Sequence, residues 1–199
     1  GCWERRWFGV GCQPLPFATI AGMKGWLRRY TDHPDPLVAA GNFVALVLAW
    51  NQPFYPLYLW FIVGSDAWVA LPDILSGLFL FAIPMIARRT ALLGRALLPV
   101  FGVGNILVVS FLLGEGAGIW LLLFPCAMLA VLLFRWSERW WMLGLTSLPM
   151  AAWLVTRGRF PTPLVPFSYE QLESMMTMNA ASAFAPMVFF GWVFAKRPA

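Results

Sequence analysis

Residues 37–63 read LVAAGNFVALVLAWNQPFYPLYLWFIV, an apolar stretch without a single Lys, Arg, Asp or Glu. A helix needs about 20 apolar residues to cross the roughly 30 Å hydrocarbon core of a bilayer, so this stretch is long enough for one span and too short for two. Its centre contains Pro53 and Pro56. Because proline removes a backbone donor and clashes with the preceding helical turn, we expect the first span to be kinked there.

The composition of the whole chain agrees with a membrane protein. Of its 199 residues, 60% are hydrophobic and 12% are charged, about half of the charged fraction of soluble domains. The net charge of +5 forms no basic face, which argues against a nucleic-acid partner. The sequence therefore predicts an all-α integral membrane protein.

Residue types needed for most catalysis are scarce. His33 is the single histidine, and Cys2, Cys12 and Cys126 have no C-x-x-C spacing. Neither a metal site nor a disulfide framework follows, and no nucleophile-histidine pair is available. We therefore expect no catalytic residues, no metal and no cofactor, and an enzyme is the weaker interpretation.

Further apolar stretches predict a single bundle of six transmembrane helices. Their expected limits are residues 37–63, 68–87, 96–113, 119–134, 140–156 and 175–195. With six spans, every Lys and Arg except Arg157 and Arg159 falls on one side. Because loops rich in Lys and Arg stay in the cytoplasm, both termini are expected on the cytoplasmic side of the cell membrane.

Two parts of the chain are expected to differ. Residues 1–30 begin with Gly1, contain a plausible start at Met23, and are expected to form a cytoplasmic tail that is disordered or not translated. Residues 31–199 are expected to form the six-helix domain.

Polar side chains within the apolar stretches are the candidates for ligand binding, because amides in hydrocarbon must find partners in a bundle interior. Two interpretations stay open for them: they join helices, or they form a small pocket in the outer half of the membrane. Asp73 and Glu115 either bind a cation or ligand or cap span ends at the interface. The proposed ligand-binding set is Asn51, Gln52, Tyr55, Tyr58, Asn105, Glu115 and Trp120.

Small residues predict close helix packing at two places. Gly114 and Gly118 flank a tight turn, and are expected to let the third and fourth spans approach each other. Ala181 and Ala185 are expected to let the sixth span pack tightly, because small residues permit backbone contact in lipid.

One segment resembles part of a known family. The run GEGAGIWLLLFP from Gly114, followed by AVLLF and SER up to Arg139, resembles a recurring stretch in six-helix membrane modules at the N-termini of bacterial signalling proteins. Those proteins carry histidine kinase, nucleotide cyclase or diguanylate cyclase output domains. The likeness extends more loosely over residues 31–197, through Asn42, Tyr58 and Asn105.

The resemblance implies a sensor or anchor whose final helix passes a signal to a cytoplasmic output domain or partner, with a homodimer as one form. Residues 1–199 contain no cyclase or kinase motif, so the output domain would lie in a longer chain or a separate protein. The alternatives are a small transporter or channel component, and a subunit that assembles a membrane complex.

Overall fold

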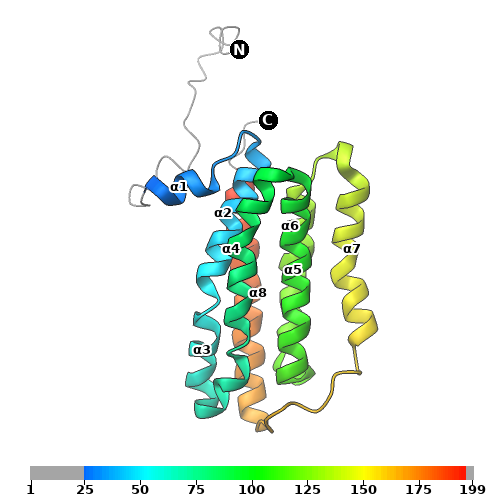
Figure 1. Ribbon diagram of the computed structural model, residues 1–199. Coiled ribbons are helices and arrows are strands. Elements are labelled where there is room, and N and C mark those ends of the chain that lie inside the picture. The colour runs from blue at the N-terminus through cyan, green and yellow to red at the C-terminus, as the bar shows by residue number, and fades with distance from the viewer. Residues whose placement is uncertain (1–24, 196–199) are drawn as a thin grey trace, which may run out of the picture.

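The computed structural model describes residues 25–195, and every regular element in that range is helical. The helices form an elongated bundle in which successive rods run in opposite directions (Figure 1). We call the end that carries α1 and the last turn of α8 the near end, and the opposite end the far end. The elements are α1 (Gly25–Thr31), α2 (Pro36–Asn51), α3 (Phe54–Val63), η2 (Gly64–Ala70), α4 (Asp73–Arg89), α5 (Ala91–Leu113), η3 (Glu115–Ala117), η4 (Ile119–Leu122), α6 (Leu123–Leu133), η5 (Trp136–Glu138), α7 (Arg139–Thr156) and α8 (Tyr169–Ala195).

Local capping decides where α2 and α8 begin. At α2, the Asp35 carboxylate accepts a hydrogen bond of 2.9 Å from the Leu37 backbone N–H, and Pro36 occupies the first turn, where its missing donor costs nothing. At α8, Ser168 and Gln171 bond reciprocally to each other's backbone N–H at 2.8 and 3.2 Å. This capping box starts α8 at Tyr169, six residues before the predicted start of the sixth span.

Two neighbouring rods are interrupted. The first apolar stretch ends α2 at Asn51 and resumes as α3 at Phe54, with Gln52 and Pro53 in a turn between them. The next rod changes from the 3₁₀-helix η2 to α4 at Leu71 and Pro72. The proline is at the expected place, and the predicted kink in the direction of the span stays a prediction.

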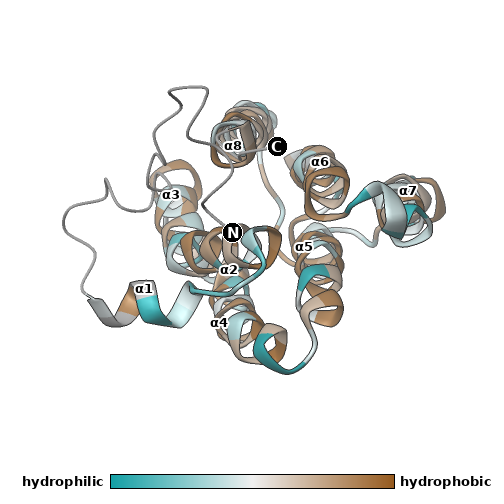
Figure 2. Cartoon of the chain, turned by 90° about the horizontal axis from the view of Figure 1, so that it is seen from above, coloured by the Kyte–Doolittle hydropathy of each residue, from teal (hydrophilic) through white to brown (hydrophobic). Residues whose placement is uncertain are grey.

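The hydrophobic interior consists of two clusters. One lies toward the near end and includes Phe43, Leu133 and Phe190; the other includes Leu59, Leu113 and Met175. The outside is apolar as well, as Figure 2 shows from above: Phe61 is 78% exposed and Leu78 is 67% exposed. Soluble proteins rarely expose so many large apolar side chains together, whereas lipid would cover them.

Three helical segments among the described residues are long and apolar enough to cross a membrane: Pro36–Ala70, Ala91–Leu113 and Tyr169–Ala195. The pair Ile119–Leu133 and Trp136–Thr156, bent by 116°, adds a fourth if it is one broken span. The α4 helix has 17 residues, or about 26 Å at 1.5 Å per residue, and is short for a hydrocarbon core of about 30 Å. The protein is thus all-helical with three to four candidate spans, and the count of six stays a prediction.

The predicted N-terminal tail falls mostly outside the described part, which begins at residue 25. Residues 25–31 form α1, which contacts α4. The Arg88 guanidinium donates to the carbonyls of Arg29 and Tyr30 at 3.1 and 3.2 Å, and the Tyr30 hydroxyl donates to the Phe81 carbonyl at 2.6 Å. The predicted domain boundary at residue 31 stays a prediction.

Candidate functional site

Asp73, the first residue of α4, is the centre of the candidate site. It is 4% exposed. Asn105 of α5 donates a hydrogen bond of 2.6 Å to its Oδ1 atom. The side-chain amide of Gln52, at the break between α2 and α3, has its nitrogen toward Asp73 and donates to Oδ2 at 2.8 Å and to Oδ1 at 3.1 Å. With the amide turned the other way, the Gln52 oxygen faces only acceptors.

These contacts bring three separate elements together at the two interruptions of the helices. Gln52 belongs to one interruption, and Asp73 directly follows the other. The first turn of a helix also favours a negative charge, because its N–H groups point along the axis without intrahelical partners. Burial disfavours the ionised carboxylate, and the three N–H contacts from amides and the start of α4 partly offset that effect.

The carboxylate borders a cavity of about 380 Å³. Such a volume lies in the range of small-molecule sites. Its polar lining is Asn51, Gln52, Tyr55, Tyr58, Asp73, Ser76, Asn105 and Ser182; most of the remaining lining is apolar, from α4, α5, α6 and α8. The lining contains no Lys, Arg or His, and Asp73 forms no ion pair within residues 25–195.

Five of the seven residues predicted to bind a ligand line this cavity: Asn51, Gln52, Tyr55, Tyr58 and Asn105. The other two do not. The Glu115 carboxylate accepts a hydrogen bond of 3.0 Å from the Gly158 backbone, and the Trp120 ring lies 6.2 Å from that of Trp153. Both therefore hold the far-end connections.

Sequence reasoning left Asp73 out of the proposed ligand-binding set. Its position beside Pro72 is equally typical of a cap at a span end. The available signal was that Asp73 is an acidic residue within a predicted span, while amides on two other spans needed partners.

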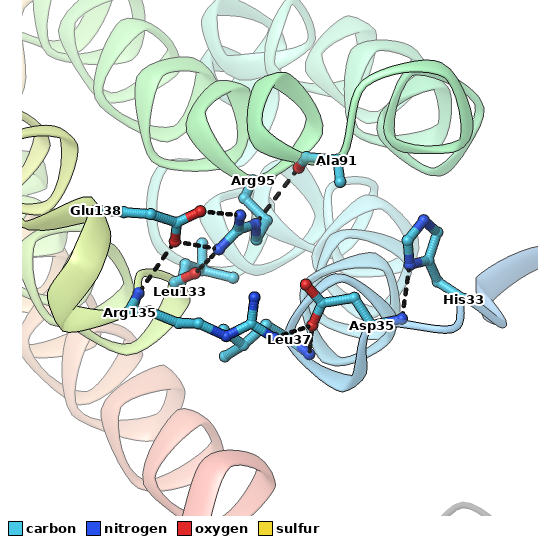
Figure 3. Close-up of polar contacts among 8 residues, drawn as sticks. All are labelled: His33, Asp35, Leu37, Ala91, Arg95, Leu133, Arg135 and Glu138. Carbon is cyan, nitrogen blue, oxygen red and sulfur yellow. Dashed lines mark hydrogen bonds and ion pairs between the residues drawn. The ribbon is translucent and has the colours of Figure 1, made fainter.

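A second polar cluster lies at the near end (Figure 3). Arg95 of α5 is 4% exposed, and its guanidinium donates to both Glu138 oxygens at 2.8 and 2.6 Å. It also donates to the Leu133 carbonyl at 2.9 Å, which caps the end of α6. We call this arrangement the Arg95 clamp; it joins α5 to the α6–α7 connection.

The Arg95 clamp continues to the start of α2. The Glu138 carboxylate also accepts from the Arg135 backbone at 3.1 Å, and the Arg135 guanidinium pairs with Asp35 at 2.9 Å. The backbone N–H of Asp35 in turn donates to Nδ1 of His33 at 3.0 Å (Figure 3). Hydrogen bonding from Arg95, with further help from Arg135, lowers the pKa of Glu138 below its ordinary value.

The residues predicted to allow close packing are placed differently from the expectation. Gly114 and Gly118 have positive φ angles of 82° and 76°, and a Cβ atom on them would meet Pro163 and Met176 respectively. They thus leave room for the α7–α8 connection and α8, and their part in the approach of α5 to α6 stays a prediction. Ala181 and Ala185 are exposed, because the inward phase of α8 contains Asn179 and Ala183, which are buried.

Metal chemistry has no support within residues 25–195, where no group of three or more His, Cys, Asp or Glu could hold an ion. Cys126 is a free cysteine that lines the cavity. It lies on the apolar helix α6, an environment in which a thiol is inert.

The site must be interpreted from its own geometry. In comparisons with protein-family models, curated proteins and solved structures, no match to this chain was found. The resemblance to bacterial signalling modules therefore stays an expectation. What the described residues provide is a buried, hydrogen-bonded carboxylate at the edge of an apolar cavity, within an all-helical protein able to span a membrane.

Proposed function

We propose that this protein is a non-catalytic sensor module of a bacterial signal-transduction system, which binds a small molecule in the Asp73 cavity. The observation that carries the proposal is the carboxylate itself. A charge in the middle of a bilayer costs at least about 2.5–3.5 kcal/mol, and Asp73 meets amides instead of a cation. Ionisable groups within membranes are functional by default.

Six spans with both termini in the cytoplasm give the arrangement that this proposal needs. The α4–α5 and α6–α7 connections lie at the near end with α1 (Figure 1). Arg88 and Arg89 end α4 there, Arg135 lies in the α6–α7 connection, and Arg139 begins α7. Arg157 and Arg159 lie in the connection at the far end. Under the positive-inside rule, the near end is cytoplasmic, and the cavity lies between the near-end cluster and the other hydrophobic cluster, since its lining includes members of both.

The α8 helix offers a route from the cavity to the near end. Ser182, Pro186 and Phe190 line the cavity, and Phe190 also packs in the near-end cluster with Val193 and Leu133. Occupancy of the cavity would favour one of two packings of α8. The change would pass to an output domain or partner protein that follows α8, in a monomer or a homodimer.

A reporter fusion tests this proposal. The chain, fused to a histidine kinase output domain, should change its output when Asn51→Ala, Tyr58→Phe or Asp73→Asn is introduced at equal expression. Glu115→Gln is the matched control, because Glu115 is acidic but lies outside the cavity lining. If the three cavity variants all give the same output as the parent, the sensor proposal is wrong.

A small transporter is the second candidate, and one observation favours it. Transporters often place their substrate where two discontinuous helices meet near the middle of the membrane, and here Gln52 and Asp73 meet at two such interruptions. This alternative predicts solute flux in proteoliposomes that Asp73→Asn abolishes. If the protein transports a solute but the cavity variants leave the output of the kinase fusion unchanged, transport is the correct function and sensing is not.

A further inference from the structure

We infer that the ligand of the cavity is a lipophilic amine, a small organic cation with an apolar or aromatic body that reaches the site from the bilayer. This inference rests on the proposed binding function and adds the chemical class of the ligand. It depends on the charge, the shape and the access of the cavity.

The charge of the site selects a cation. Asn105 and Gln52 together place three N–H contacts of 2.6–3.1 Å on the carboxylate oxygens; such donors favour its ionised form, whereas burial of the group disfavours that form. No basic side chain lines the cavity. An unneutralised negative charge between low-dielectric walls concentrates cations, and a ligand ammonium would supply the missing partner.

The apolar walls select an organic cation over a metal ion. The cavity of about 380 Å³ is far larger than a dehydrated ion, and its lining includes Tyr58, Phe79, Phe101 and Phe190. The rings of Phe79 and Phe101 are stacked with their centroids 5.4 Å apart. Aromatic faces attract an ammonium and also cover an apolar body.

Access from the membrane follows from the exposed part of the lining. Leu75 and Phe79 of α4 are 60% and 55% exposed, and Val108 of α5 is 53% exposed, although all three border the cavity. The cavity therefore reaches the lateral surface of the bundle between α4 and α5. Amphiphilic amines partition into bilayers and would enter there with the ammonium leading toward Asp73.

Calorimetric titration of the full chain in nanodiscs of zwitterionic lipid tests the inference, with empty nanodiscs as the reference. The probes are 4-phenylbutylammonium, the neutral 4-phenylbutanol and the anionic 4-phenylbutyrate, at pH 7. We expect the ammonium to bind at least about tenfold more tightly than the alcohol, and Asp73→Asn to remove that difference, which corresponds to about 1.4 kcal/mol. Glu115→Gln, the matched loss of an acidic side chain outside the cavity, should bind as the parent does.

The remaining outcomes separate this inference from the function on which it rests. If the alcohol binds as tightly as the ammonium, or Asp73→Asn retains the preference, charge recognition is wrong. The Gly104→Leu variant then tests whether the probes bind in the cavity at all. A Cβ atom on Gly104 meets no atom within 4 Å, so the leucine side chain can occupy part of the cavity. Loss of all binding in that variant would leave the cavity as a ligand site of other specificity. If no probe binds the parent, the amine inference fails, and the reporter fusion decides the sensor proposal separately.

Discussion

The Asp73 cavity and the Arg95 clamp treat a carboxylate in opposite ways. The two Glu138 oxygens accept hydrogen bonds from the buried Arg95 guanidinium, and the Arg135 backbone N–H donates a further one. Asp73 is more deeply buried, at 4% exposure, yet its carboxylate accepts hydrogen bonds only from side-chain amides. The protein pairs the first carboxylate with a cation of its own, so that pair stabilises the fold, whereas the second carboxylate has no cationic partner within residues 25–195.

Packing differs between positions within each region. At the near end, a Cβ atom on Gly94 would lie 2.5 Å from the Cβ atom of Ala87 and 2.7 Å from its Cα atom. Beside the cavity, a Cβ atom on Gly102 would lie 2.8 Å from the Cys126 sulfur, whereas one on the exposed Gly104 meets nothing within 4 Å. The helices are therefore closely packed at Gly94 and Gly102, and the free space lies at the lateral surface beside Gly104.

The largest expected effect comes from breaking the Arg95 clamp. Glu138→Ala leaves a buried guanidinium without its counter-charge. This change should lower the free energy of unfolding by about 3 kcal/mol. The value is at the low end of the range for buried pairs, because Glu138 is 23% exposed. Reversible unfolding in mixed detergent micelles measures this. The control is Arg135→Ala, which breaks an exposed pair with Asp35 and should cost no more than about 0.5 kcal/mol. Equal effects of the two variants would refute the assignment of the clamp as the main anchor.

Two glycine substitutions test how closely the helices pack around Gly94 and around Gly104. Gly94→Ala forces α4 and α5 apart and should destabilise the protein by about 1–3 kcal/mol. Gly104→Ala lies in a helix with free space around it, and should stabilise the protein by about 0.5–1 kcal/mol. The same unfolding assay compares them. A destabilising Gly104→Ala would mean that the free space beside the cavity is filled in solution.

Acid should weaken the clamp selectively. The native pKa of Glu138 lies below its ordinary value of 4.5, so this residue contributes stability that is complete above about pH 5 and is lost as pH falls through the lowered native pKa. Glu138→Gln lacks this contribution at every pH. The stability difference between the parent and Glu138→Gln, measured from about pH 6 downward, should therefore shrink on acidification. A constant difference would contradict the assignment.

The smallest effect on stability is expected at Asp73. Asparagine has nearly the same shape, its oxygen still accepts from Asn105, and no protein cation is left without a partner. Asp73→Asn should change the free energy of unfolding by less than about 1 kcal/mol. A loss as large as that of Glu138→Ala would make Asp73 a structural residue and remove the contrast between the two regions.

The sequence indicated which polar side chains border the cavity better than where the charged ones lie. Asn51, Gln52, Tyr55, Tyr58 and Asn105 line it, although Asn51 and Tyr58 are exposed and do not follow the rule that polar side chains on apolar spans face the interior. Ligand binding by these residues stays a prediction. Glu115 was misplaced because the turn at Gly114 and Gly118, both at positive φ, directs it to Gly158.

The Arg95 clamp could not be predicted in the same way. Arg95 was expected to lie before the third span, but α5 begins at Ala91 and places Arg95 in its second turn, on the buried face. Its pairing with Glu138 spans 43 residues and depends on the rotation of α5 and on the shape of the α6–α7 connection. Neither is encoded in a local pattern. The helical class followed from composition, whereas the six-span count awaits measurement of topology.

The shift in the unfolding midpoint on addition of 4-phenylbutylammonium tests the central claim most directly, because it reports the fold and the ligand together. The parent and Glu138→Gln should both be stabilised by the amine, with Glu138→Gln starting from a lower midpoint, while Asp73→Asn should start near the parent midpoint and show a clearly smaller shift. An equal shift in all three proteins, or a shift lost in Glu138→Gln and kept in Asp73→Asn, would contradict the account.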